Sequence, residues 1–67
     1  MRHHLQRQRQ GRWHEVGTFA APGDALLAAR LMADHTRTPH RVVRLCRGRE
    51  TLVGVMHHPR DPQPRLC

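Results

Sequence analysis

The chain contains no lysine, although twelve of its 67 residues are arginines and only five are acidic. Its positive charge is therefore carried by guanidinium groups, which bind phosphate or carboxylate through two parallel hydrogen bonds. A formal net charge of +7 favours a polyanionic partner. Protonation of the seven histidines would strengthen such binding as the pH falls through about 6.5. The codon usage of a GC-rich genome is the alternative cause of the arginine excess, and one sequence does not separate the two.

Serine is absent, which excludes a Ser-His-Asp triad, and the chain has neither a glycine-rich phosphate loop nor paired carboxylates that could share a proton. His14 and Glu15 are adjacent in an extended segment, so their side chains should face apart. A Cys46 nucleophile with a histidine base stays open, but an apolar-flanked cysteine in a strand is more often packed than reactive. We predict a non-enzymatic protein that needs no cofactor.

Long apolar runs are missing as well. The longest is Ala25 to Ala29, far short of the roughly 20 residues that span a bilayer. The first ten residues lack the apolar core of a secretory signal. Cys46 and Cys67 could form one disulfide, but we expect two reduced thiols. These features predict a cytoplasmic protein with no membrane contact.

Composition divides the chain into three parts. Residues 1–11 are basic, polar and rich in glutamine, which predicts a flexible arm. Residues 59–67 contain three prolines, which exclude a helix or a central strand and predict an irregular tail. The single folded domain then spans residues 12–58. No internal repeat is apparent.

The pattern within residues 12–58 predicts an α+β domain. Residues 12–19 are rich in strand-forming types, and Trp13 and Phe19 share a parity that would place both on one side of a sheet, in the core. A helix begins at Pro22 and runs to about residue 35. Two strands follow, residues 40–46 and 50–56, joined by a hairpin turn in which Gly48 supplies a positive φ. The order strand–helix–strand–strand places one helix on a three-stranded, mainly antiparallel sheet.

The predicted helix is apolar around most of its circumference, with only Arg30 and Asp34 as a polar wedge. A helix lying on one small sheet needs one apolar stripe, so the wider coverage predicts burial on a second side. We expect a homodimer or another protein partner, with Leu27, Leu31 and Met32 at the interface. This adaptor role is the alternative to polyanion binding.

The arginines outside the helix predict contacts with a phosphate backbone. Each neutralised phosphate would add to affinity through counterion release. Arg41 and Arg44 have opposite parity, so these two do not form a stripe on one face. We predict nucleic acid, DNA or RNA, as the partner, and a solvated basic surface without a ligand is the alternative. The predicted contacts are Arg7, Arg9, Arg12, Arg41, Arg44, Arg47 and Arg49.

The histidines lack the spacing of metal ligands. His3-His4 and His57-His58 are adjacent pairs, and adjacent strand residues point to opposite faces. No spacing resembles a zinc finger. We therefore predict no metal site and surface positions for the histidines, with His35 near the C-terminal end of the helix, where its charge is favourable.

Residues 13–19, followed by Asp24-Ala25 and a helix with Leu27 and Leu31, resemble the opening of a SPOR domain. That family begins with an aromatic residue, a strand leading to Gly-Ser-Phe, and a helix entered through a Glu-Asn-Ala-like segment. The resemblance covers residues 13 to 55. It implies a sheet-and-helix fold whose sheet face binds glycan, as in bacterial cell-envelope proteins that recognise peptidoglycan stripped of its stem peptides.

The sequence departs from the SPOR pattern at several points. Glu15 stands where the family usually has glutamine, and Thr18 where it has serine. The second helix and fourth strand of the family have no counterpart, because the proline-rich segment from Pro59 cannot form them. The resemblance therefore supports the topology more than the ligand, and glycan binding is the third candidate function.

Overall fold

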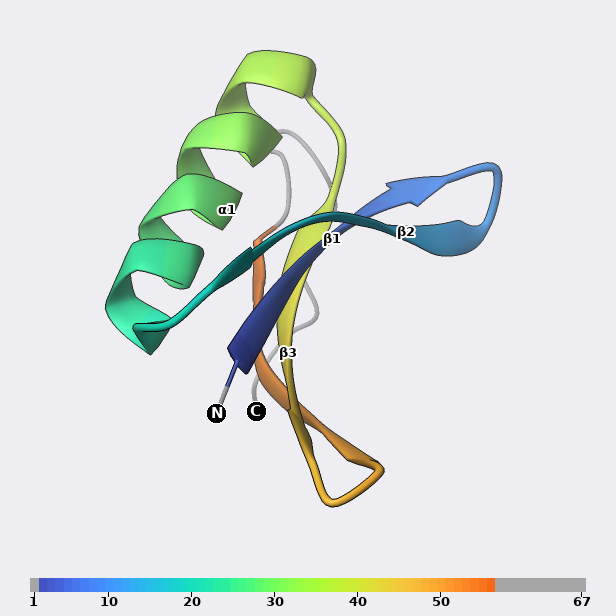
Figure 1. Ribbon diagram of the computed structural model, residues 1–67. Coiled ribbons are helices and arrows are strands. Elements are labelled where there is room, and N and C mark those ends of the chain that lie inside the picture. Colours follow the sequence, from blue (N-terminus) through green and yellow to red (C-terminus); the bar gives the residue numbers. More distant parts are fainter. Residues whose placement is uncertain (1, 57–67) are drawn as a thin grey trace, which may run out of the picture.

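The structure, a computed structural model, describes residues 2–56. Strands β1 (Arg2–Arg9) and β2 (Arg12–Phe19) precede the helix α1 (Pro22–Thr36), and strands β3 (His40–Cys46) and β4 (Arg49–Met56) follow it. The strands form one antiparallel sheet in the order β2-β1-β3-β4, and α1 covers one face (Figure 1). The predicted α+β class is confirmed, with four strands instead of three. The predicted tail, residues 59–67, and His57-His58 lie outside the described residues.

The segment predicted to be a flexible arm forms β1, so that prediction is wrong. β1 is a central strand that pairs with β2 on one side and with β3 on the other. Its one aliphatic hydrophobe, Leu5, is only 1% exposed. The neighbouring positions of the same parity hold His3, which is buried, and Arg7, which is half-buried, so this face of β1 is covered although its sequence is polar. A strand with one hydrophobe can therefore occupy the middle of the sheet.

The two hairpins follow one plan. The first hairpin (β1 and β2) turns at Gln10-Gly11, with φ of 55° and 75°, and the second hairpin (β3 and β4) turns at Arg47-Gly48, with φ of 52° and 76°. Two-residue turns with positive φ at both positions match the twist of the flanking strands. Both outer strands also carry one unpaired extra residue, Val16 in β2 and Val53 in β4. Turn type and bulge position therefore agree.

A local two-fold axis relates the hairpins. Each residue from 3 to 19 corresponds to the residue 37 positions further along, and every cross-strand pair of the first hairpin has its equivalent in the second. Leu5 lies directly opposite Val42, its own counterpart, so the axis passes through this pair. The correspondence of the two hairpins corrects the expectation that the sequence contains no internal repeat. The identical residues are His3/His40, Arg7/Arg44, Gly11/Gly48, Arg12/Arg49, Val16/Val53 and Gly17/Gly54.

The core lies where α1 crosses this axis. Ala25, Ala29 and Ala33 are buried one turn apart along α1, and Leu5 and Val42 join them from the sheet. Small residues at this spacing let the helix backbone approach the strands closely. The helix ends where Arg37 adopts a left-handed conformation, two residues before Pro39, which agrees with the predicted end.

The bulge at Val16 changes the faces of the aromatic residues. Phe19 pairs with His3 and packs against the core, whereas Trp13 pairs with Gln8 on the opposite face of the sheet. The predicted shared face of Trp13 and Phe19 is therefore wrong. Their parity is equal only in a regular strand, and one extra residue reverses it.

Candidate nucleic-acid interface

Three of the seven predicted arginines lie on the first hairpin, at one end of the sheet. Arg7 is directly opposite His14, and Arg9 is directly opposite Arg12. These side chains share the parity of Leu5, so they project from the face that carries α1. Arg7, Arg9 and His14 are among the residues that line an open hollow of about 480 Å³. This end of the sheet therefore presents three guanidinium groups and an imidazole on one side.

The second hairpin carries the corresponding group at the other end of the sheet. Arg44 is opposite Thr51, Arg49 is opposite Cys46, and Arg47 lies in the turn. Four of these residues, all except Arg44, line a hollow of about 330 Å³. Because the hairpins correspond, the two hollows share three equivalent lining positions, 9/46, 10/47 and 14/51. The carboxylate of Glu15 also lines the first hollow, and no carboxylate of the described residues lines the second.

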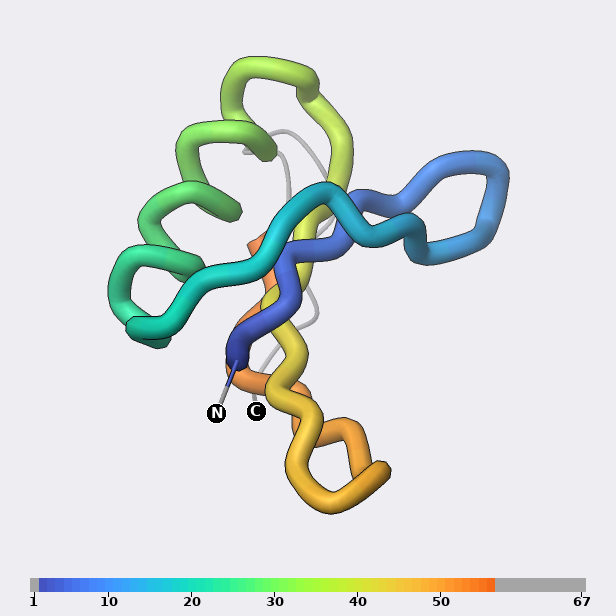
Figure 2. Tube along the Cα trace, in the orientation of Figure 1, coloured from blue at the N-terminus to red at the C-terminus, as the bar shows by residue number. Residues whose placement is uncertain are grey.

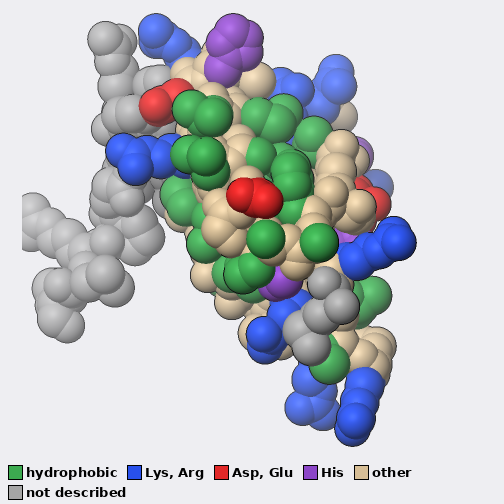
Figure 3. All heavy atoms as spheres, turned by 60° about the vertical axis from the view of Figure 1, so that its left-hand side comes forward, with side chains coloured by type: hydrophobic (Ala, Val, Ile, Leu, Met, Phe, Trp, Pro, Cys, Tyr) green, Lys and Arg blue, Asp and Glu red, His purple; other side chains and the backbone are tan. Residues whose placement is uncertain are grey.

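The predicted arginines do not form one surface. β1 and β3 are antiparallel, so the two hairpin turns lie at opposite ends of the sheet, and Figure 2 shows them projecting away from each other. Arg41 lies on the open sheet face, away from α1, whereas Arg44 has the parity of buried Val42, as their opposite parity predicted. In the view of Figure 3, the arginine side chains gather near the margins of the molecule. The arginines thus form two basic ends, with Arg41 apart from both.

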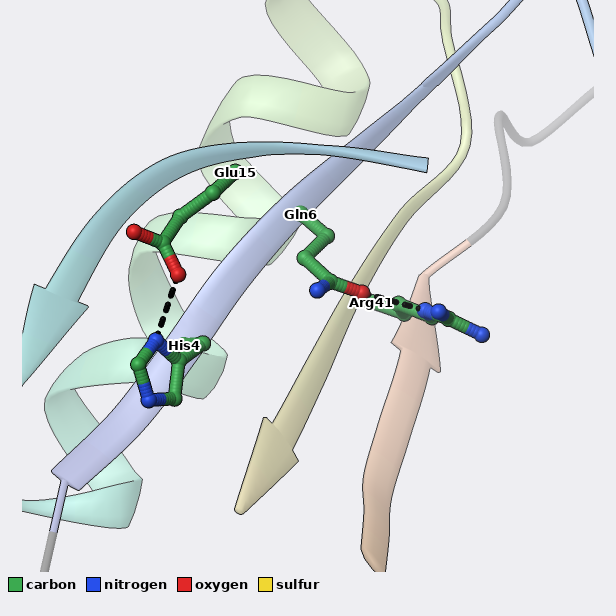
Figure 4. Close-up of polar contacts among 4 residues, drawn as sticks. All are labelled: His4, Gln6, Glu15 and Arg41. Carbon is green, nitrogen blue, oxygen red and sulfur yellow. Dashed lines mark hydrogen bonds and ion pairs between the residues drawn. The ribbon is translucent and has the colours of Figure 1, made fainter. Parts of the chain in front are cut away.

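Arg41 is held in place on the open face by two neighbours. Its Nε donates a hydrogen bond to Gln6 Oε1 at 2.7 Å (Figure 4), and its guanidinium carbon lies 4.4 Å from the centre of the Trp13 ring. A guanidinium above an indole ring is a favourable cation–π arrangement. Trp13 is therefore half-buried beneath Arg41, and the prediction that it lies in the core is wrong.

Within residues 2–56 the only ion pair joins His4 and Glu15, whose Nδ1 and Oε1 atoms are 2.5 Å apart (Figure 4). The imidazole donates and the carboxylate accepts. Glu15 was expected to face away from its sequence neighbour His14. Its partner, His4, lies instead on the adjacent strand β1. In this part of the chain no arginine forms an ion pair with a carboxylate.

Two histidines expected on the surface are buried. His3 is 6% exposed and His40 is fully buried, with its Nδ1 donating to the carbonyl oxygen of Thr38 at 2.8 Å. His3 lies opposite Arg44, and His40 lies opposite Arg7. His3 Nδ1, His40 Nε2 and the Nε atoms of both arginines are buried without a hydrogen-bond partner. Sequence reasoning missed these two pairs, although each histidine stands two positions before the hydrophobe at the axis, which is the spacing of a shared strand face.

Two of the three residues predicted to form an interface on α1 lie on its exposed surface. Leu27 and Leu31 lie one turn apart and are 58% and 59% exposed, whereas Met32 packs against the core. The apolar side chains of the helix surface stand out in Figure 3. Among the described residues, α1, with 15 residues, does not reach the length and apolar character that a membrane-spanning helix requires.

Neither a metal centre nor a known family can be assigned from the described residues. Between residues 2 and 56 no three His, Cys, Asp or Glu side chains lie close enough together to hold a metal ion. Cys46 is a free, half-buried thiol, and Cys67 lies outside the described range. No protein-family model, curated protein sequence or solved structure matches the chain. The SPOR resemblance therefore stays a prediction.

Proposed function

We propose that the chain is a small non-enzymatic module that binds nucleic acid through the arginines of its two hairpins. The proposal is carried by the absence of any arginine–carboxylate ion pair within residues 2–56, where ten arginines accompany four carboxylates. Glu15, which lines the first hollow together with Arg7 and Arg9, already pairs with His4. Guanidinium groups without a carboxylate partner keep their donors available for phosphate oxygens.

Binding of this kind is expected to depend on phosphate contacts and to discriminate weakly between sequences. Recognition of single strands commonly uses exposed aromatic rings on which bases stack. Phe19 packs against the core and Trp13 lies beneath Arg41, so neither offers a fully exposed ring. Arginine contacts with the backbone position a protein on nucleic acid without reading bases.

Salt dependence of binding tests the proposal. Fluorescence anisotropy with a labelled duplex and with one of its strands should show affinity that falls linearly on logarithmic axes between low and physiological salt. For a duplex, the expected slope is about −0.9 for each phosphate neutralised. A protein that binds neither probe at micromolar concentration in low salt is not a nucleic-acid-binding module.

Assembly through α1 is a second candidate function, favoured by the exposure of Leu27 and Leu31. Two exposed leucines one turn apart are the kind of apolar patch that a second copy of the chain can cover. Leu27→Glu or Leu31→Glu should then shift sedimentation from dimer to monomer. Leu45→Glu is the matched control, because Leu45 is also exposed but lies on the sheet, outside α1. A monomer in the wild-type protein would remove this candidate.

A further inference from the structure

We infer that the chain has two quasi-equivalent phosphate-binding sites, one at each hairpin, related by the local two-fold axis. The first site centres on Arg7 and Arg12, and the second on Arg44 and Arg49. The inference rests on the proposed function and makes it more specific. It assigns the phosphate contacts to two defined places instead of a diffuse basic surface.

The residues that the two hairpins share fall into two kinds. Gly11 and Gly48 have positive φ in the turns, and Val16 and Val53 are the extra residues of the bulges, so these identities follow from the backbone. The remaining shared residues, apart from the glycines beside the bulges, are all basic. The turn and bulge geometry does not require them. They are His3/His40, Arg7/Arg44 and Arg12/Arg49.

These basic residues also face one another across the strands. Arg7 lies opposite His40 and His14, and Arg9 lies opposite Arg12. The guanidinium groups of Arg9 and Arg12 carry like charges, and like charges directly opposite each other destabilise a strand pair. In the second hairpin Arg49 faces Cys46, so this repulsion belongs to the first site. No carboxylate of the described residues forms an ion pair with these arginines. A bound anion would relieve the repulsion.

The buried nitrogens repeat with the same symmetry. Arg7 and Arg44 each have a buried Nε without an acceptor, and so do the ring nitrogens of the histidines opposite them. A half-buried guanidinium has lost part of its hydration, so a nearby anion stabilises it more than it would stabilise an exposed arginine. The same unsatisfied arrangement at both ends points to one ligand chemistry for both.

Phosphate fits these sites better than carboxylate. A carboxylate is planar and matches one guanidinium fork, whereas a phosphate group offers oxygens in several directions and can accept from arginines on two strands. The open hollows of about 480 and 330 Å³, lined by Arg7 of the first site and by Arg49 of the second, leave room beside these arginines for the group and its ester substituents. The first hollow is lined by Arg7, Arg9 and His14 together with Glu15, whose carboxylate already pairs with His4, and the second is lined by Arg47 and Arg49. The additional imidazole of the first site should make it bind more tightly.

Titration with inorganic phosphate and pyrophosphate tests the sites directly. In a phosphate-free buffer, the arginine Nε–H signals in ¹H–¹⁵N spectra should respond to the probes. We expect the signals of Arg7 and Arg44 to shift with saturation, Arg7 at the lower concentration. Arg7→Ala should abolish the first transition and leave the second, and Arg44→Ala the reverse. Arg30→Ala, which removes an exposed arginine of α1, should change neither. Equal, unsaturated drift of all arginine signals would overturn the inference.

Nucleic-acid binding separates failure of the sites from failure of the proposed function. The salt slope of duplex binding should fall by about 1 for Arg7→Ala and for Arg44→Ala, and by about 2 for the double variant. Unchanged slopes in folded variants would refute the two sites and leave the proposed function standing. If the wild type does not bind nucleic acid, the proposed function fails and the phosphate titration still decides the sites. Arg7→Lys, which keeps the charge, should keep the slope and controls for loss of folding, followed by circular dichroism.

Discussion

The first and second hairpins have the same backbone and different surfaces. Their turns, bulges and cross-strand pairs correspond residue by residue. On the open face, however, the first hairpin carries Gln8 and Glu15, where the second carries the exposed Leu45 and Leu52. The register is therefore set by the turns and by the buried pair at the axis. The open-face positions are free to differ in charge and polarity.

The largest effect on stability is expected at the buried pair on the axis, Leu5 and Val42. Leu5→Ala should lower the free energy of unfolding by about 2–5 kcal/mol, because it removes a fully buried side chain between the sheet and α1. Val42→Ala, at the corresponding position, should cost less because it deletes fewer carbon atoms. Chemical denaturation followed by circular dichroism measures both. A negligible effect of Leu5→Ala would mean that the N-terminal segment is an arm after all.

Substitution of the glycines beside the bulges, Gly17 and Gly54, should affect the stability of the protein unequally. A Cβ at Gly54 would lie 2.8 Å from Leu26 Cδ2, whereas a Cβ at Gly17 would have nothing within 4 Å. Gly54→Val should therefore cost about 1–3 kcal/mol through overpacking against α1. Gly17→Val is the matched control and should be close to neutral. Equal melting temperatures of the two variants would contradict the asymmetric packing of α1.

Substitution of the turn glycines, Gly11 and Gly48, should affect the stability of the protein equally. Gly11 and Gly48 have nearly equal positive φ, and a Cβ at either position meets no atom within 4 Å. Gly11→Ala and Gly48→Ala should each cost about 1 kcal/mol, because the cost is the left-handed backbone alone. Thermal unfolding of the two variants should therefore give the same shift. A shift for Gly48→Ala alone would show that only the second turn is formed.

The smallest effect is expected on the open face, where Arg41 and its counterpart His4 make different contacts. Arg41→Ala removes the contact with Trp13 and the hydrogen bond to Gln6, and should cost about 0.5–1 kcal/mol. Trp13 is the only tryptophan, so its emission reports on the loss directly. His4→Ala should leave that emission unchanged. A red shift in both variants would place Trp13 in a different environment from the one described.

Sequence reasoning recovered the parts of the fold that have strong local signals. Pro22 and Pro39 bounded the helix, Gly48 marked the second turn, and alternation placed Arg41 and Arg44 on opposite faces. The first hairpin was missed although Gln10-Gly11 is the same kind of turn as Arg47-Gly48. The glutamine-rich composition of the segment outweighed that signal, because a strand with one hydrophobe lacks the usual alternation.

For the candidate site, sequence reasoning named residues but not their arrangement. The sequence named the arginines, but their division between two ends depends on the pairing of β1 with β3, which is non-local. The face of Trp13 depended on the bulge at Val16, which has no local sequence signal. The burial of His3 and His40 became clear only when both strands were placed against α1.

The axis through Leu5 and Val42 also bears on how copies of the chain can meet. β1 and β3 are equivalent strands of the two hairpins, and they pair with each other across the axis. The β1 of one copy can therefore pair with the β3 of another copy in the same register. The connection through α1 keeps both hairpins at high effective concentration and favours closure within one chain. Crowding of copies at high concentration shifts this balance, and exchange of hairpins gives a domain-swapped dimer that needs no new contacts.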